Sequence, residues 1–147
     1  MIPILVMHGP NLNLLGTREP EIYGAMDLDA LNERLRVLGE SLGLQVSAFQ
    51  SNHEGALIDR LQEAGHSARG VIFNPAGYTH TSVALRDAVS AIQIPVIEVH
   101  LSNVQAREPF RRVSLLSEVC LGTISGFGWI SYAVALHALQ QTLDAGR

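Results

Sequence analysis

The sequence contains no lysine: all ten of its basic residues are arginines. This absence excludes Schiff-base chemistry at a lysine, the phosphate-binding lysine of a P-loop and the lysine of a receiver-type phosphorylation site. Any group that binds an anion or polarises a carbonyl must therefore be arginine, histidine or a backbone N–H.

Cysteine and long apolar runs are also scarce. The single Cys120 cannot form an internal disulfide, and there is no export signal and no apolar run long enough to cross a bilayer. We therefore expect a soluble, cytoplasmic protein. A net charge of −4 argues against a nucleic-acid groove and a membrane-binding patch, and leaves a small molecule as the expected partner.

Apolar runs alternate with amphipathic stretches along all 147 residues, without a linker, so residues 1–147 are expected to form a single catalytic domain. The patterns predict strands at residues 2–7, 44–50, 70–75, 95–100 and 119–124. Helices are predicted after an Asp27 cap up to Gly43, after Ser51 and Asn52, from Thr81 or Ser82 to Ala91, from Asn103 to about Ser117, and after Gly128.

Five strands that alternate with helices predict an α/β three-layer sandwich whose sheet is parallel and covered by helices on both faces. The number of units favours the flavodoxin-like strand order 2-1-3-4-5. In that order a ligand binds beyond the carboxyl ends of the strands, where the first and third strands part. Polar residues just past the strands should therefore converge there, namely Asn11, Asn74, His80, Glu98, His100 and Ser102.

The connection after the first strand, GPNLNLLGTREPEIYG at residues 9–24, is much longer than the usual two to six residues. Its leucines, Ile22 and Tyr23 are too apolar for a solvated linker. We expect an ordered loop that carries Asn11, Arg18 and Tyr23 toward the cleft, with residues 16–24 as a mobile active-site lid.

His100 and Glu98 lie two residues apart in a predicted strand and therefore on the same face. The carboxylate can hold the imidazole tautomer and raise the pKa of the ring, as a general acid requires. The alternative is a buried ion pair that only stabilises the strand.

Tyr23 is either an apolar anchor of the loop or, as a phenolate, a base. An ordinary phenol, with a pKa of about 10, is only about 0.1% ionised at neutral pH. Lowering its pKa to about 7 takes roughly 4 kcal/mol of preferential stabilisation of the anion. Arg18 on the same loop is the nearest candidate, and it suffices only in a closed site that excludes water.

Two further stretches carry hydrogen-bond donors at the start of predicted helices. The stretch from Asn74 to Ser82 suits a hydroxylated or anionic ligand, and the backbone at Leu101 and Ser102 can hold a carboxylate. Arg107 and Arg111 are one turn apart on the predicted helix, either as a solvated face or as anion-binding groups. Asp87 fits a surface or interface ion pair.

The remaining signals are weak. Glycines 126 and 128 lack the context of a nucleotide fingerprint, and histidines 8, 53, 66 and 137 have no metal-ligand spacing, so we assign them no function.

A binding module for FMN or another nucleotide is an alternative, but the leucines of the long loop are poor phosphate ligands. A receiver domain is disfavoured, because the lysine that it requires is absent, and an inactive assembly protein is a further alternative.

The long loop, together with THTSVALRD at residues 79–87 and EVHLSNVQAREPFR at residues 98–111, resembles the type II 3-dehydroquinate dehydratases. The resemblance covers essentially the whole chain. It implies a flavodoxin-like fold and a lyase that removes water from 3-dehydroquinate to give 3-dehydroshikimate. The reaction is an anti elimination through an enolate, in the shikimate pathway or in quinate breakdown, without metal or cofactor.

The resemblance also implies a role for each matching residue. Tyr23 is the base, assisted by Arg18, while His100, oriented by Glu98, protonates the leaving hydroxyl, and Asn11 stabilises the enolate through a water. The implied substrate-binding residues are Asn74, His80, Asp87, Leu101, Ser102 and Arg111.

In this family Asp87 corresponds to a residue contributed by a neighbouring subunit, and the implied assembly is a homododecamer of trimers. The sequence departs from the common family pattern at Ala76 and Gly77, whose order is reversed, at Leu115, and at residues 129–131. None of these positions is a proposed proton-transfer group.

Overall fold

The computed structural model describes residues 1–23 and 25–146, and only the backbone of Tyr23. Its sheet has the predicted order β2-β1-β3-β4-β5, and every neighbouring pair is parallel. The strands are β1 (Ile2–His8), β2 (Leu44–Gln50), β3 (Gly70–Asn74), β4 (Val96–His100) and β5 (Gly122–Ser125). The flavodoxin-like fold is thus confirmed.

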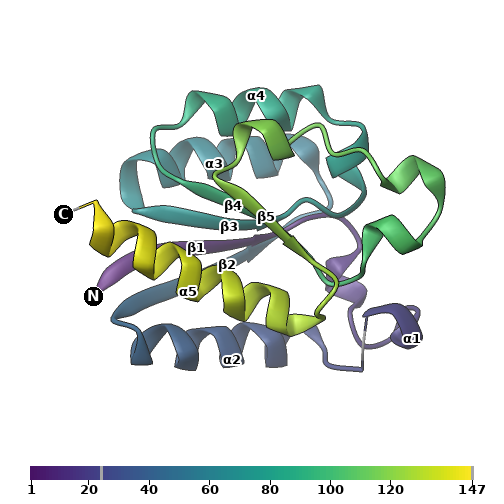
Figure 1. Ribbon diagram of the computed structural model, residues 1–147, viewed down its shortest axis with the longest axis horizontal. Coiled ribbons are helices and arrows are strands. Elements are labelled where there is room, and N and C mark those ends of the chain that lie inside the picture. Colours follow the sequence, from purple (N-terminus) through teal and green to yellow (C-terminus); the bar gives the residue numbers. More distant parts are fainter. Residues whose placement is uncertain (24, 147) are drawn as a thin grey trace.

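Helices cover both faces of the sheet (Figure 1). One face packs against α2 (Leu28–Ser41) and α5 (Trp129–Ala145), and the other against α3 (Glu54–Ser67) and α4 (Val83–Ala91). Alternate strand residues enter the two cores: Ile4 and Val6 face α2 and α5, whereas Leu5 and Met7 face α3 and α4. Because of this alternation, residues at the ends of the strands also face one layer or the other.

Two predicted caps are confirmed. The Asp27 side chain accepts a hydrogen bond from the Ala30 N–H at the start of α2, and the Ser82 side chain accepts one from Leu85 N–H at the start of α4. Each bond satisfies one of the backbone donors that a helix leaves unpaired at its first turn.

The predicted cap of α3 at Ser51 and Asn52 was wrong, because the cap residue is His53. The two polar side chains have other partners: Ser51 Oγ accepts from His53 N–H, and Asn52 Oδ1 accepts from Asn11 N–H at 2.9 Å. Asn52 therefore ties the long loop after β1 to the loop after β2.

The predicted helix from Asn103 to about Ser117 was also wrong. Asn103 caps only the short 3₁₀ turn η3 (Val104–Ala106), which is followed by η4 (Pro109–Arg111) and η5 (Ser117–Val119). Pro109 lacks an N–H and disfavours the helical conformation of the residue before it, and Glu108 is accordingly extended. The connection from β4 to β5 is therefore not a βα unit.

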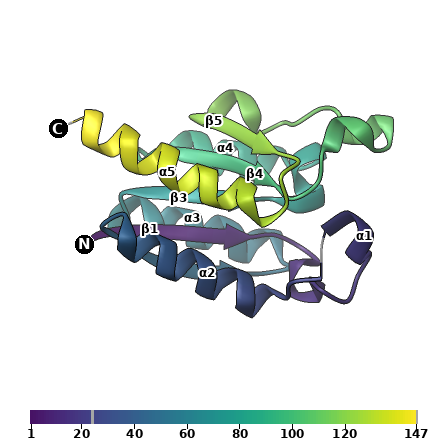
Figure 2. The same ribbon diagram turned by 60° about the horizontal axis from the view of Figure 1, so that its bottom comes forward.

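The loop after β1 contains a 3₁₀ turn, η1 (Leu12–Leu14), and a short helix, α1 (Pro20–Tyr23). Leu12 and Leu15 are buried in the core, which confirms that the loop is ordered there. Of the predicted lid at residues 16–24, Gly24 and the Tyr23 side chain lie outside the described part of the chain. Figure 2 shows α1 and the green turns around residues 104–111 at the end of the sheet to which β1 points.

Within residues 1–23 and 25–146, no helix is both long and apolar enough to cross a membrane.

Candidate active site

A cavity of about 150 Å³ lies beyond the carboxyl ends of β1, β3 and β4. Eight of the predicted site residues line it: Asn11, Arg18, Asn74, His80, His100, Leu101, Ser102 and Arg111. The structure thus brings together side chains that are up to 100 residues apart in the sequence. The convergence follows from the parallel sheet, whose strand ends all reach the same edge.

Three predicted residues need separate comment. Glu98 does not line this cavity but lies behind His100. Asp87 is exposed on α4 and is not part of the cavity wall in this single chain. The side chain of Tyr23 lies outside what the structure describes, although its backbone ends α1, five residues after Arg18.

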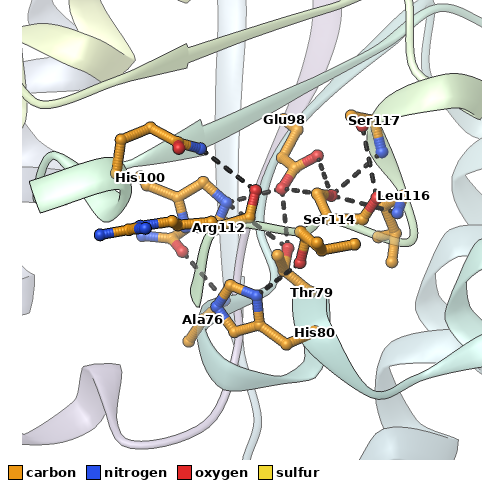
Figure 3. A network of polar contacts seen from close by, with 12 residues as sticks. Ala76, Thr79, His80, Glu98, His100, Arg112, Ser114, Leu116 and Ser117 are labelled. Atoms are coloured by element: carbon orange, nitrogen blue, oxygen red, sulfur yellow. Dashed lines mark hydrogen bonds and ion pairs between the residues drawn. The ribbon is translucent and has the colours of Figure 1, made fainter. Parts of the chain in front are cut away.

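His100 and Glu98 form a buried pair, with 2.6 Å between His100 Nε2 and Glu98 Oε2 (Figure 3). The Thr79 hydroxyl donates to the same carboxylate oxygen at 2.8 Å, and the Ser114 hydroxyl lies 2.9 and 3.0 Å from the two oxygens. His100 also lines the cavity, so the ring lies between the buried carboxylate and the cavity.

Ser114 has only one way to arrange its hydroxyl hydrogen. The N–H groups of Leu116 and Ser117 both donate to Ser114 Oγ at 3.1 Å, so the hydroxyl proton points to Glu98 (Figure 3). Burial by itself would raise the pKa of Glu98, but the hydrogen bonds and charge of His100, with the bonds from Thr79 and Ser114, outweigh it and lower the pKa. The group facing His100 is therefore a carboxylate.

The cavity wall also carries three guanidinium groups, those of Arg18, Arg107 and Arg111. The Arg107 Nη1 lies 3.3 Å from Ser102 Oγ, and Arg111 pairs with Glu108 at 2.9 Å. Arg107 and Arg111 do not share a helix as predicted, yet both reach the cavity from the turns after β4. Three guanidinium groups around one cavity are chemically suited to an anionic ligand, although each also has a neighbouring glutamate, Glu19 or Glu108, as a partner.

The opposite part of the wall is built from the turn after β3. Asn74 Nδ2 donates to the Tyr132 hydroxyl at 3.0 Å, and Asn74 Oδ1 accepts from Ala76 N–H at 3.0 Å. Gly9 is required where the loop after β1 passes this turn, since a Cβ there would lie 2.5 Å from the Pro75 carbonyl oxygen. The loop and the turn are thus held in direct contact.

Sequence reasoning missed the residues that support these groups. Thr79 and Ser114 hold Glu98, and His8 and Tyr132 form a buried hydrogen-bonded pair at 2.9 Å. Tyr132 reads as an ordinary core aromatic on α5, and Ser114 as a loop polar residue. Only the fold shows that these residues lie beside the site. The position of His8, at the end of a strand and beside the long loop, could have marked it as a residue near the site.

Among the described residues, no three His, Cys, Asp or Glu side chains are grouped so as to hold a metal ion.

Comparison with known proteins gives consistent matches. The family model described as "Dehydroquinase class II" matches residues 2–140. A 3-dehydroquinate dehydratase of Ruegeria pomeroyi is 55% identical over 144 residues, which cover 98% of this chain and 97% of the relative. One from Bordetella avium is 58% identical over 134 residues, covering 90% of this chain and 93% of the relative.

A solved structure, the type II dehydroquinase from Propionibacterium acnes, superimposes with a TM-score of 0.94 and 41% sequence identity. The superposition covers 96% of this chain and 97% of the other chain. The similarity thus includes both the strands and the loops that form the cavity.

Proposed function

The chain belongs to the class II dehydroquinase family and carries out its reaction, the dehydration of 3-dehydroquinate to 3-dehydroshikimate; from this premise, we propose how its residues divide the chemistry. The substrate has a ketone, several hydroxyl groups and a carboxylate. The reaction takes a proton from C2, beside the ketone, expels the hydroxyl at C1 as water, and leaves a double bond conjugated with the ketone.

The observation that carries the proposal is the position of His100, between the cavity and the buried Glu98 carboxylate. Protonated His100 donates its proton to the departing hydroxyl, which leaves as water. Glu98 stabilises the imidazolium before transfer and holds the ring in one orientation. A structural ion pair alone would not need the imidazole to line a cavity.

Tyr23 is the proposed base. As a phenolate it removes the C2 proton, and Arg18, five residues earlier and in the cavity wall, supplies the positive charge that favours the phenolate. The segment 16–24 acts as the lid that excludes water and so strengthens this interaction. Asn11, also in the wall, stabilises the enolate oxygen through a water molecule.

The remaining wall residues bind the substrate. Its carboxylate is held by the backbone at Leu101 and Ser102, while its hydroxyls are held by Asn74, His80 and Arg111. The location of these groups around one cavity supports this assignment, because they offer donors on several sides of a small polyhydroxylated acid.

We also propose that the protein acts in the cytoplasm as a homododecamer built from trimers, in which a neighbouring subunit contributes Asp87. Asp87 is exposed on α4, as such a contact requires. Several large apolar side chains are exposed on the turns and at the edge of the sheet, including Phe110, Val113 and Leu121. Sedimentation velocity tests the assembly, and a monomer at micromolar concentration would contradict it.

The direct test of activity is to mix the protein with 3-dehydroquinate and follow the ultraviolet absorbance of the conjugated enone. No absorbance change with folded, assembled protein would refute the function. The base is tested by Tyr23→Phe, which should abolish turnover while leaving the affinity for substrate largely intact. If this variant keeps most of its activity, Tyr23 is not the base.

A further inference from the structure

Five described residues form a continuous chain of hydrogen bonds across the interior of the protein. His8 Nε2 lies 2.7 Å from Asn32 Oδ1 on α2, and His8 Nδ1 lies 2.9 Å from the hydroxyl of Tyr132 on α5. The Tyr132 hydroxyl is 3.0 Å from Asn74 Nδ2, and Asn74 Oδ1 is 3.0 Å from the Ala76 nitrogen. This series of hydrogen bonds begins at α2, passes the end of β1 and ends at the cavity, which Asn74 and Ala76 line.

The direction of every bond follows from one donor whose identity is not in doubt, the backbone N–H of Ala76. Since this group can only donate, the carbonyl oxygen of Asn74 must face it, and the Asn74 amide group must face Tyr132. The Tyr132 oxygen therefore accepts from Asn74, and its proton must go to His8 Nδ1. His8 then carries its own proton on Nε2, which donates to Asn32 Oδ1.

The reverse arrangement leaves a buried group unsatisfied. If His8 were protonated on Nδ1, Tyr132 would accept two hydrogen bonds, and its own proton would have no acceptor among the described residues. Both side chains are fully buried, so no surface water is at hand to compensate. Burial lowers the pKa of His8 to about 4, against a smaller opposing effect of the bond to Asn32, so the ring is neutral at physiological pH.

We propose that Tyr132 and His8 are positioning residues for substrate binding, which hold the Asn74 amide in a single orientation with one N–H presented to the cavity. One N–H of Asn74 Nδ2 is used by Tyr132, and the carbonyl oxygen is used by Ala76. The second N–H of Asn74 Nδ2 has no partner in these two bonds, so the group offered to the ligand is a donor. The site at Asn74 thus selects an acceptor oxygen, such as a hydroxyl lone pair or a carboxylate.

This inference rests on the proposed role of Asn74 in binding substrate, and a double-mutant cycle tests the two separately. In Tyr132→Phe the amide loses its acceptor, so the KM for 3-dehydroquinate should rise about tenfold while kcat changes less than about twofold. In the Asn74→Ala background the same change should alter KM by less than about twofold, because no amide is left to orient.

The matched control is Tyr78→Phe. This variant also removes a tyrosine hydroxyl that is hydrogen-bonded, here to the Asn52 carbonyl oxygen at 2.9 Å, but Tyr78 does not line the cavity. Its KM should stay within about twofold of the wild type. Effects of Tyr132→Phe and Asn74→Ala that multiply, or an unchanged KM in a folded Tyr132→Phe protein, would overturn the inference.

A spectroscopic measurement tests the inference without depending on the activity of the enzyme. The ¹⁵N spectrum of the His8 ring in the wild-type protein should show a protonated Nε2 and an unprotonated Nδ1 at neutral pH. A protonated Nδ1, alone or in an imidazolium, would overturn the inference even if the enzyme is active. Conversely, a wild-type protein without turnover would refute the proposed function but leave the ring assignment to be decided by this spectrum.

Discussion

Two buried histidines, His8 and His100, end two strands of the same sheet, β1 and β4, which lie on either side of β3, and they have different kinds of partner. His8 ends β1 and faces the α2 and α5 layer, where its partners are Asn32 and Tyr132. His100 ends β4 and faces the other side, where its partner is the Glu98 carboxylate. His100 lines the cavity, whereas His8 is linked to it only through Tyr132 and Asn74.

The difference between them lies in the charge of the partner. An amide and a phenol do not offset the cost of burying a charged ring, so His8 stays neutral and acts as a link of defined polarity. His100 instead has a negatively charged partner, the Glu98 carboxylate, and in the proposed mechanism it delivers a proton to the leaving hydroxyl. The same residue type, at the end of a strand, thus has a structural role or the proposed catalytic role according to the group that it contacts.

The largest expected effect comes from removing the proposed proton donor. His100→Gln retains a side chain of similar size but cannot protonate the leaving hydroxyl, so kcat should fall about a thousandfold. Steady-state turnover of 3-dehydroquinate measures this loss, with the affinity for a non-reacting substrate analogue as the control for an intact cavity. More than about a tenth of wild-type kcat would show that another group donates the proton.

The next effect comes from giving His100 the kind of partner that His8 has. Glu98→Gln replaces the carboxylate by an amide, so the imidazolium loses its counter-charge and kcat should fall about a hundredfold. Steady-state turnover of 3-dehydroquinate measures this loss, with the affinity for a non-reacting substrate analogue as the control for an intact cavity. An unchanged kcat would mean that the charge of Glu98 does not matter for the reaction.

His8 should be visible in the pH dependence of stability. Its folded pKa is below its ordinary value, so between pH 6.5 and about 4 the unfolded chain binds the extra proton, and folded stability falls as the pH is lowered. The loss should reach about 3 kcal/mol at the acid end of this range.

Urea unfolding of the wild type and of His8→Asn at several pH values isolates this contribution. Carboxylates, Glu98 included, also destabilise the protein on acidification, but they titrate in both proteins, so the difference between the two curves belongs to His8. Asparagine keeps an acceptor for the Tyr132 hydroxyl without titrating. Parallel curves would contradict the neutral, buried state of His8.

The smallest effect concerns the turn after β3, whose Ala76 N–H fixes the direction of the hydrogen bonds from Asn74 to His8. Ala76 has a left-handed φ of +52°, which an alanine adopts at a cost, whereas Gly77 has an ordinary φ and space for a Cβ, with no atom within 4 Å. Exchanging the two residues by Ala76→Gly and Gly77→Ala should raise the free energy of unfolding by about 1 kcal/mol. Thermal unfolding measures it, and a less stable protein would refute the explanation.

The sequence predicted the parts of this molecule that depend on periodicity and on strand ends. Buried runs and helical spacing gave the order of the sheet, and the order of the sheet gave the location of the cavity. Strand alternation placed Glu98 and His100 on one face, as the structure confirms. These features depend on residues close together in the sequence, or on a rule that applies to all parallel sheets.

The parts that could not be predicted depend on contacts between distant segments. Ser51 and Asn52 have the right chemistry for a helix cap, but their side-chain oxygens accept hydrogen bonds from the backbone N–H groups of His53 and Asn11 instead. A spacing suited to a helix after Asn103 was outweighed by Pro109. The partners of Glu98 and of Asn74 come from residues 16 and 58 positions away, and no local pattern marks Ser114 or Tyr132 for these roles.

The bond between His8 and Tyr132 spans 124 positions of the chain, and Tyr132 belongs to the last helix. During translation, β1 and the long loop after it leave the ribosome before the aromatic side chain that aligns the amide of Asn74. The proposed alignment of Asn74 is therefore acquired only when α5 has been synthesised and has docked on the sheet. A nascent chain interrupted after β5 retains every proposed proton-transfer group, but Asn74 has no phenol to orient it.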